Sequence, residues 1–339
     1  KTIKGFKTQS YATDPVAATA AWSSGGALPT AVNNQAGFGI QTAAVSAGGY
    51  TPGGATNNVQ TYNGTAWTEV NNMTRSPTEY ANRGAGTTAA GVTWGGTPTT
   101  GKTEKWDGTS WTASGVMNTA RYGTMATGTQ TAALCGSGVV DPPITVNCET
   151  FNGSTWTEIN NVNTARRSPA GGGTTTAAII FGGGVPTTAT ADAETWNGTS
   201  WSEGNNLNTA RGYAMGTGDT VPTTIAFGGD PTTAKTETYD GTSWTEVGDM
   251  ATARADGAGA GTGKTSALCI GGEPPRTTAT EEWNDYSSTN PAPSLTMLNE
   301  GQIWYNTDST ALKYTAGIGA WTSGTNMPAG YNGLGGFGT

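Results

Sequence analysis

The sequence contains no histidine and only three cysteines, and this scarcity excludes several kinds of catalytic site. Without histidine the chain can form neither a Ser-His-Asp or Cys-His catalytic arrangement nor a histidine-ligated metal site. It also lacks the side chain that acts most often as a general base. The cysteines show no Cys-x-x-Cys spacing, so neither a disulfide scaffold nor a zinc site is indicated. We therefore expect no metal, no cofactor and no enzymatic activity.

Charge is also scarce, since only 12% of the residues are charged and the formal net charge is −8. No Lys/Arg cluster occurs, which argues against a nucleic-acid partner. No apolar run is long enough to span a bilayer, so membrane insertion is not expected. Disordered chains are rich in charge and poor in aromatic residues, whereas this chain has 12 tryptophans and 53 glycines. This composition favours many short strands joined by glycine turns.

One phrase recurs along the chain, and its clearest copy is TETYDGTSWTEV at 236–247. The Asp-Gly pair supplies the left-handed angles of a tight hairpin, and Tyr239 and Trp244 flank it at strand positions. Related phrases begin at 61, 105, 150 and 195. The tryptophans after the turns are spaced 43 to 45 residues apart, at Trp67, Trp111, Trp156, Trp201 and Trp244.

Each repeat carries further marks at fixed places. An arginine follows the tryptophan strand in five copies, at Arg75, Arg121, Arg166, Arg211 and Arg254. A glutamate precedes the hairpin turn in five copies, at Glu104, Glu149, Glu194, Glu237 and Glu281. An apolar strand that ends in glycines lies between the two marks. Because these charges recur once per repeat, we expect them to form hydrogen bonds between repeats and not to catalyse a reaction.

Four short strands in each 43 to 45 residues predict an all-β fold, a β-propeller whose blades are the repeats. The glycine pair, the aromatic strand and the later tryptophan resemble the kelch repeat over residues 18–289. The repeated phrase is less similar to the Asp-box of sialidase-type propellers. The Asp-box places one residue between Asp and Gly, whereas in this chain the two are adjacent, as at Asp240 and Gly241.

The number of blades follows from a missing tryptophan and a spare one. The glycine-ended strand occurs six times, but the sixth copy has Ser288 where the tryptophan would stand. A tryptophan without a preceding turn phrase, Trp22, lies 45 residues before Trp67. We therefore predict six blades over 18–289, the last one completed by the N-terminal strand around Trp22, which leaves no edge unpaired.

The ends of the chain differ from the blades. Residues 1–17 are predicted to be a linker or leader, and residues 290–339 a hairpin linker followed by the start of a further module, because 321–338 repeat 22–39. The segment GQIWYNTDSTALKYTAGIGAW at 301–321 resembles linker and fibre segments of tailed-phage structural proteins, particularly of marine phages. This resemblance implies a virion or extracellular location. It also implies other virion proteins as partners, and head-to-tail assembly with other copies or continuing modules.

The resemblance implies a structural fibre or appendage protein, with recognition of host-surface polysaccharide as an extension of that role. Aromatic residues outside the turns are the candidate glycan contacts, at Tyr50, Tyr80, Trp94 and Tyr213. One alternative is a carboxylate-based glycan hydrolase or lyase, which needs two converging acids from the non-repeated set of Asp14, Asp141, Asp219, Asp230, Asp256 and Glu273. A kelch-type protein-binding scaffold is the other alternative.

Two cysteines, Cys135 and Cys148, fall on strands that the repeat predicts to be neighbours. Either they form a disulfide or they are small buried residues.

Overall fold

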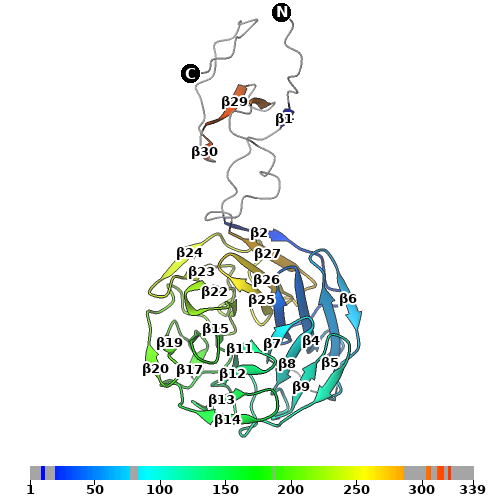
Figure 1. Cartoon of the computed structure of the whole chain (residues 1–339), viewed down its shortest axis with the longest axis vertical. Coiled ribbons are helices and arrows are strands. Elements are labelled where there is room, and N and C mark those ends of the chain that lie inside the picture. The colour runs from blue at the N-terminus through cyan, green and yellow to red at the C-terminus, as the bar shows by residue number, and fades with distance from the viewer. Residues whose placement is uncertain are drawn as a thin grey trace, which may run out of the picture. The chain divides into compact units, whose positions relative to one another are not determined.

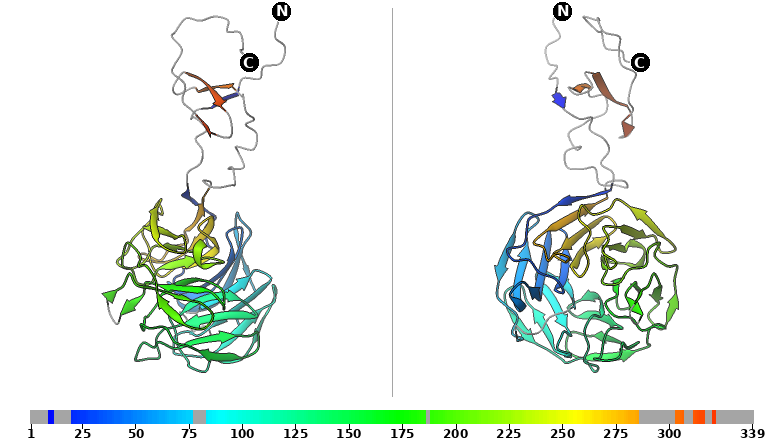
Figure 2. Two further views of the ribbon diagram at one scale, coloured as in Figure 1. Left: turned by 60° about the vertical axis from the view of Figure 1, so that its left-hand side comes forward. Right: turned by 180° about the vertical axis from the view of Figure 1, so that it is seen from behind.

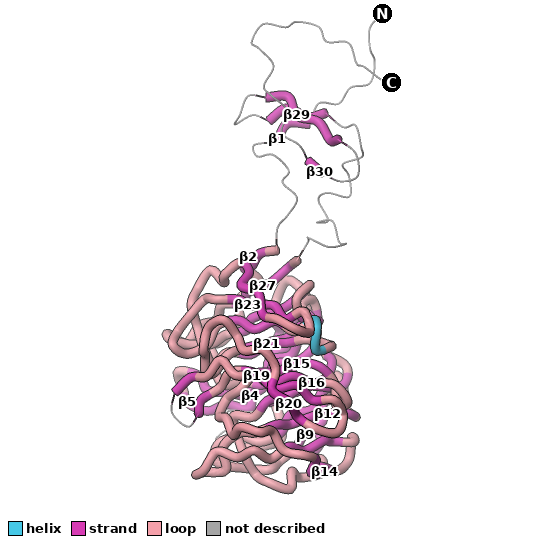
Figure 3. Tube along the Cα trace, turned by 90° about the vertical axis from the view of Figure 1, so that its left-hand side faces the viewer, coloured by secondary structure: helices cyan, strands magenta, loops and turns pink. Residues whose placement is uncertain are grey.

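The computed structural model of the chain describes residues 20–76, 83–185 and 188–285, together with the backbone of short strands at 9–11, 303–306, 311–316 and 320–321. The chain divides into two compact units, one of residues 21–284 and one of residues 1–20 with 285–339. The regular structure of the described residues is almost entirely β, the exception being the 3₁₀ turn η1 at Val221–Thr223, drawn in cyan in Figure 3.

The larger unit is a ring of six four-stranded antiparallel sheets, a six-bladed β-propeller (Figures 1 and 2). Blade 1 consists of β3 (Ala36–Ile40), β4 (Ala43–Thr51), β5 (Gly54–Tyr62) and β6 (Trp67–Val70). Blade 2 consists of β7 (Arg83–Thr87), β8 (Ala90–Trp94), β9 (Thr103–Trp106) and β10 (Trp111–Ala113). Blade 3 consists of β11 (Met125–Thr129), β12 (Ala132–Gly136), β13 (Cys148–Phe151) and β14 (Trp156–Ile159).

Blade 4 consists of β15 (Ala170–Gly173), β16 (Ala178–Phe181), β19 (Ala193–Trp196) and β20 (Trp201–Glu203). Blade 5 consists of β21 (Met215–Thr217), β22 (Ile225–Phe227), β23 (Thr236–Tyr239) and β24 (Trp244–Val247). Blade 6 consists of β25 (Ala258–Gly263), β26 (Ser266–Ile270), β27 (Thr280–Asn284) and the N-terminal strand β2 (Ala21–Ser24). A small hairpin of β17 (Gly184–Val185) and β18 (Thr188–Ala189) extends from blade 4.

The repeated phrase forms the outer hairpin of a blade, as predicted. In blade 5 the Asp240 carboxylate accepts hydrogen bonds from the backbone N–H groups of Thr242 and Ser243, each at 2.7 Å. Tyr239 then lies directly opposite Trp244, with ring centroids 4.9 Å apart. The turn therefore fixes the register, and the register brings the two aromatic rings together.

Each outer tryptophan packs against the preceding blade. It contacts the third strand of that blade at the same position in every copy of the repeat. That position is a threonine in three blades, and Trp22, Trp67 and Trp156 donate to the hydroxyls of Thr236, Thr280 and Thr103 at 2.8, 3.0 and 2.9 Å. In the other three blades the position is apolar, held by Val59, Cys148 and Ala193, which share core clusters with Trp111, Trp201 and Trp244. The indole N–H groups of these last three tryptophans are buried without a partner.

The repeated arginines and glutamates form buried ion pairs across five of the six seams between blades. The arginine leaves the outer strand of one blade, and the glutamate lies on the third strand of the next, as in Arg166–Glu194 at 2.6 Å. The other pairs are Arg75–Glu104, Arg121–Glu149, Arg211–Glu237 and Arg254–Glu281, and every side chain among the five pairs is at most 5% exposed. The repetition had predicted this structural role.

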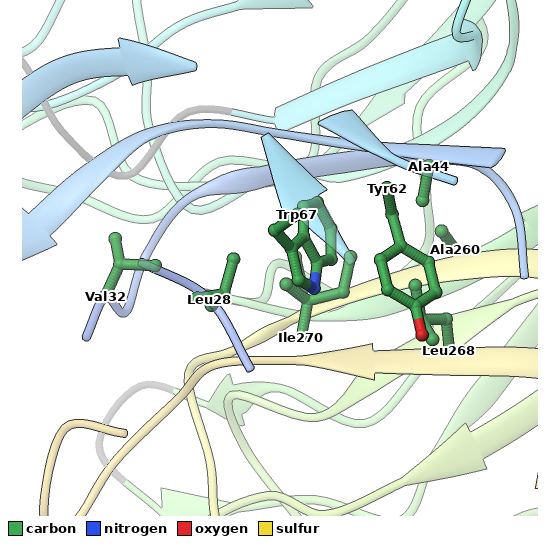
Figure 4. Close-up of a cluster of buried hydrophobic side chains, with 9 residues drawn as sticks. Leu28, Val32, Ala44, Tyr62, Trp67, Ala260, Leu268 and Ile270 are labelled. Carbon is green, nitrogen blue, oxygen red and sulfur yellow. The ribbon is translucent and has the colours of Figure 1, made fainter. Parts of the chain in front are cut away.

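The sixth seam closes the ring and is built differently. Strand β2 pairs with β27, with Trp22 opposite Trp283, so the prediction that the N-terminal strand completes blade 6 is confirmed. At this seam Val32 and Gln60 occupy the places of the arginine and the glutamate. Val32 packs with Leu28, Trp67, Leu268 and Ile270 in the cluster shown in Figure 4. Apolar contact therefore replaces the ion pair where the ring closes.

The two neighbouring cysteines are not bridged. Cys135 lies opposite Glu149 and Cys148 opposite Gly136, which places their side chains on opposite faces of blade 3. Both are free thiols, and burial raises the pKa of Cys148 to about 12. Of the two alternatives that the sequence left open, the structure shows small buried residues.

The smaller unit contains a four-stranded sheet. Strands β28 (Ile303–Asn306) and β29 (Ala311–Ala316) form the antiparallel hairpin that the sequence predicts in this segment, and β30 (Ala320–Trp321) pairs with β29. Strand β1 (Gln9–Tyr11), from the predicted leader, pairs in parallel with β28. Most of the segment expected to begin a further module, 322–339, lies outside the described residues.

The tryptophan seams generate a stability prediction. Replacing Thr280 by Val leaves the Trp67 N–H buried without an acceptor, so we expect the free energy of unfolding to fall by about 1–2 kcal/mol. The reciprocal change, Val59→Thr, offers Trp111 an acceptor and is expected to raise it by about 0.5–1 kcal/mol. Urea unfolding of both variants checks this expectation, and equal losses from both would contradict it.

Candidate functional site

One turn recurs at a mouth of the central channel. Two residues after four of the seam arginines, and after Val32 in blade 1, the backbone is left-handed, with φ of +55° at Asn34, +58° at Gly123, +49° at Ser168, +49° at Tyr213 and +60° at Asp256. We call these five the collar residues. Four of them carry a side chain where glycine is favoured, at a cost of order 1 kcal/mol each. The corresponding position of blade 2 lies in 77–82, outside the described residues.

Backbone hydrogen bonds join the collar residues of successive blades. The N–H of Asn34 donates to the carbonyl of Asp256 at 2.7 Å, that of Asp256 to Tyr213 at 3.1 Å, and that of Ser168 to Gly123 at 2.8 Å. The residues that directly follow the collar line the channel, at Gln35, Thr124, Pro169, Ala214 and Gly257. The collar therefore surrounds one mouth of this channel.

The channel itself is narrow and carries little chemistry. Its wall is the ring of innermost strands, one from each blade, and its cavity volume is about 150 Å³. Glycines line it because the strands approach closely: a Cβ at Gly259 would lie 2.6 Å from the Gly216 carbonyl oxygen, and one at Gly216 would lie 2.7 Å from the Phe181 ring. The close approach of the strands therefore leaves room in the bore for small molecules only.

Polar side chains from five blades meet at the mouth. The Arg167 guanidinium lies over the Tyr213 ring at 5.3 Å, and Arg83, which lines the channel, donates from Nε to the Thr124 carbonyl at 3.1 Å. Asp256 accepts from the Asn34 amide, from Nδ2 to Oδ2, at 2.9 Å. Blades 1, 2, 4, 5 and 6 thus each contribute a functional group.

Burial sets the electrostatics of this cluster. It raises the pKa of Asp256 to about 6, against the lowering effects of the Arg83 charge and the Asn34 hydrogen bond. It likewise raises the pKa of Tyr213, and it lowers that of Arg83. Asp256 is therefore a carboxyl group that changes its charge near neutral pH.

Two polar atoms of the cluster have no hydrogen-bond partner among the described residues although they are buried. One is a donor, Nε of Arg167, and the other is an acceptor, Oδ1 of Asp256. Nitrogen atoms of the seam residues Arg166 and Trp201 are likewise buried without a partner, so this feature is not confined to the channel mouth.

The four predicted glycan contacts have different fates. Tyr213 is a collar residue, and Tyr50 lies on the same face, where the Arg276 guanidinium is 4.6 Å from its ring centroid. Trp94 is only 1% exposed and packs edge-on against Trp156 at 5.2 Å, so its assignment as a contact is corrected to a core residue. Tyr80 lies outside the described residues.

The non-repeated acids do not converge as a set. Asp256 and Glu273 lie near enough for their charges to interact. Asp219 follows strand β21 whereas the collar residue Tyr213 precedes it, so Asp219 lies at the other end of the channel wall. Asp141 and Asp230 are exposed, and Asp14 is outside the described residues.

The sequence interpretation missed the arginines of the mouth. The chain has eight arginines, and five of them occupy the seams. The remaining three, Arg83, Arg167 and Arg276, all lie on the collar face: Arg83 and Arg167 interact with Asp256, and Arg276 donates to Asn33, beside the collar, at 2.6 Å. An arginine that departs from the repeat was the signal available in the sequence.

Comparison with known proteins supports the fold. No protein-family model matches the chain, and no curated protein matches its sequence. Among solved structures the chain is similar to that of YjhT, with a TM-score of 0.63 and 12% identity, covering 76% of this chain and 95% of the other. Likeness at this level of identity establishes the shared propeller and leaves the function open.

The described residues hold neither a candidate membrane-spanning helix nor a candidate metal site. No helix among them is both long and apolar enough to cross a bilayer. No three or more Cys, Asp or Glu side chains of the described segments are grouped so that they could hold a metal ion.

The raised pKa of Asp256 predicts how stability depends on pH. Because its folded pKa of about 6 exceeds the ordinary 3.8, the ionised carboxylate destabilises the fold above pH 6, and this effect disappears as the pH falls toward 4. Asp256→Asn should therefore raise the free energy of unfolding at pH 7.5 by about 1–2 kcal/mol and change it little at pH 4.

Urea unfolding at pH 4, 5.5 and 7.5 measures this difference. The matched control is Asp240→Asn in an exposed hairpin turn, where other blades carry Asn63, Asn152 or Asn197 and where backbone N–H groups lower the pKa of Asp240. The control should not gain stability as the pH rises. An Asp256→Asn variant that is less stable than the parent at pH 7.5 would contradict the assignment.

Proposed function

We propose that this protein is a non-enzymatic structural protein of a virion appendage, and that its propeller binds host-surface polysaccharide at the collar. The observation that carries the binding role is the contrast between constant and variable positions. The arginine and glutamate of the seam recur at five of the six seams, whereas the collar position, two residues after the arginine, is Asn34, Gly123, Ser168, Tyr213 or Asp256. Side chains that differ from blade to blade around one channel mouth are expected of a recognition surface on a repetitive scaffold.

The chemistry of the mouth suits a saccharide. Tyr213 provides an aromatic surface, and Asn34, Arg167 and Asp256 provide hydrogen-bonding groups of both kinds. The strain of a left-handed Tyr213 is of the kind that accumulates at binding sites. Tyr50 and Arg276, further out on the same face, offer a second aromatic surface for a longer chain of sugars.

The virion setting depends on the fibre-like segment 301–321, and the kelch assignment depends on the glycine and tryptophan marks of the blades. We propose with them an extracellular location and a head-to-tail assembly with other copies or continuing modules. The kelch-type protein-binding scaffold is the less favoured role, because the polar groups of the mouth suit a sugar better than an apolar side chain.

An enzymatic role is the second candidate, favoured by one observation. A carboxyl group with a pKa of about 6, such as Asp256, can act as a general acid near neutral pH. Glu273, the nearby acid, is itself 3.7 Å from Arg276. Release of reducing ends from a polysaccharide that the protein binds, abolished in Asp256→Asn, would establish this activity.

The binding proposal predicts the behaviour of two variants on a glycan array of bacterial surface polysaccharides. Tyr213→Ala removes the aromatic surface and should weaken binding by about tenfold or more, whereas Tyr213→Phe keeps the ring and should bind like the parent. Far-ultraviolet circular dichroism verifies that both variants fold. Parent-like binding by Tyr213→Ala would move the site away from the collar, and an array without any hit would remove the lectin role.

A further inference from the structure

The outer edge of blade 2 departs from the repeat at two exposed positions. Two residues after the outer tryptophan, strand β10 carries Ala113, where four other blades carry Glu69, Glu158, Glu203 and Glu246. Five residues after the tryptophan the chain has Val116, where the same four blades have Asn72, Asn161, Asn206 and Asp249. In blade 2 the edge has therefore lost its acid and gained an apolar side chain.

This apolar side chain is unusually exposed. Val116 is 64% exposed, against 46% for Ile40, the other large hydrophobic residue that is exposed in the described part of the chain. Blade 6 also lacks the acid, but it has the small residues Ser24 and Ala27 at the two positions. Blade 2 alone among the six blades combines an uncharged edge with an exposed large apolar side chain.

The backbone of β10 is open on one side. This strand is the last of its sheet, so its outer edge has no neighbouring strand among the described residues. The N–H of Ser114, directly after β10, donates inward to the Thr103 carbonyl at 2.8 Å. Because successive residues of an antiparallel strand point their backbone groups to opposite edges, the N–H and C=O of Ala113 face the open edge.

The same alternation holds in a blade that keeps the acid. In blade 4 the N–H of Gly204 donates inward to the Ala193 carbonyl at 2.8 Å, which places the backbone groups of Glu203 at the open edge. The residue two positions after the outer tryptophan is thus the one that meets any strand added to the blade. Charged residues at such positions prevent pairing between sheet edges.

We propose that the open edge of β10 pairs antiparallel with β10 of a second copy, about a two-fold axis at Ala113. Ala113 of each copy exchanges two N–H···O bonds with Ala113 of the other, and the two four-stranded sheets become continuous. This register places Thr112 opposite Ser114 of the second copy, and such hydroxyl pairs stabilise antiparallel strands. The contact lies on the rim of the propeller and goes beyond the proposed function, because it does not involve the collar.

Charge favours a second copy as the occupant of this edge. The chain has a formal net charge of −8, so two copies repel each other unless they meet where acids are absent. In the four blades that keep the glutamate, the same pairing would set two carboxylates directly opposite, with Cβ atoms about 4.5–5.5 Å apart, which is destabilising. At Ala113 this repulsion is absent, and β10 of a second copy is equally uncharged.

The surroundings of the strand leave space for the second copy. In this register Val116 lies beside the turn at 107–110 of the second copy. A hollow of about 260 Å³, lined by Lys102, Ala113 and Val116 among others, borders this end of the strand. Lys102 has the opposite charge to Asp107, which is exposed in the turn. The contact is short, so association is expected to be weak and dependent on concentration.

Sedimentation equilibrium of the full chain over a range of concentrations tests the proposal. We expect the weight-average mass to rise from 34.3 kDa toward twice this value. Ala113→Glu and Val116→Asn each restore the residue type of the other blades, so both variants should fold like the parent but dimerise at least about tenfold more weakly. Ile40→Asn is the matched control, and it should dimerise like the parent.

Two further measurements identify the strand. Amide hydrogen exchange within 111–114 should slow as the concentration rises, because pairing protects the outward N–H of Ala113. The double variant Glu203→Ala with Asn206→Val reproduces the β10 edge in blade 4. It should form larger assemblies than the parent, since each copy then carries two such edges.

A parent chain that stays monomeric at every concentration would overturn the second copy as the occupant of this edge. Association that Ala113→Glu leaves unchanged would overturn the pairing, and so would a dimer whose amides at 111–114 are not protected. Growth beyond the dimer that Ala113→Glu does not affect would point to head-to-tail contacts alone. None of these results changes the outcome of the glycan array, so the binding role at the collar is tested separately.

Discussion

The buried arginine–glutamate pair is the contact on which most of this propeller depends. Removing two charges from water is costly, so such a pair is tolerated only where its remaining donors and acceptors are also satisfied. At the seam of Arg166 and Glu194 most of them are: the arginine donates to the Asp192 carbonyl at 2.6 Å, and the glutamate accepts from the backbone N–H groups of Asn163 and Thr164 at 2.7 and 3.1 Å. Only Nε of Arg166 is buried without a partner among the described residues. The pair thus ties the loop that leaves one blade to the third strand of the next.

The same pair determines where the collar residues lie. Each collar residue follows its arginine by two positions, so anchoring the arginine places the left-handed turn at the channel mouth. At the closing seam Val32 anchors the chain by apolar contact instead, and Asn34 still reaches the collar. An anchor that does not depend on the collar side chain leaves that side chain free to differ from blade to blade. This separation explains how a repetitive chain can carry a site whose residues do not repeat.

The fold was predictable from the sequence to the extent that it depends on spacing. Trp22 could be assigned to blade 6 because the sixth repeat has Ser288 at the position where the other repeats have tryptophan. The structural role of Arg166 and Glu194 could be predicted because both residues recur once per repeat. The site was not predictable in the same way. A tyrosine in the sequence gives no sign that the backbone at Tyr213 is left-handed. Trp94 was predicted to contact glycans because the spacing of the repeats does not reveal that Trp156 of the next blade covers its ring. Sequence periodicity reveals what blades share, whereas the collar consists of what they do not share.

The central claim is that the arginine and the glutamate of a seam stabilise the propeller as a pair. A double-mutant cycle on Arg166 and Glu194 measures the coupling free energy between the two side chains directly. Arg166→Met, Glu194→Gln and the double variant would be compared with the parent by urea unfolding. Each single change leaves a buried group without its partner, which typically costs about 3–5 kcal/mol, so we expect the double variant to cost less than the sum of the singles by about 2 kcal/mol or more. Effects that add within about 0.5 kcal/mol would contradict the account, because the two charges would then contribute to the seam independently.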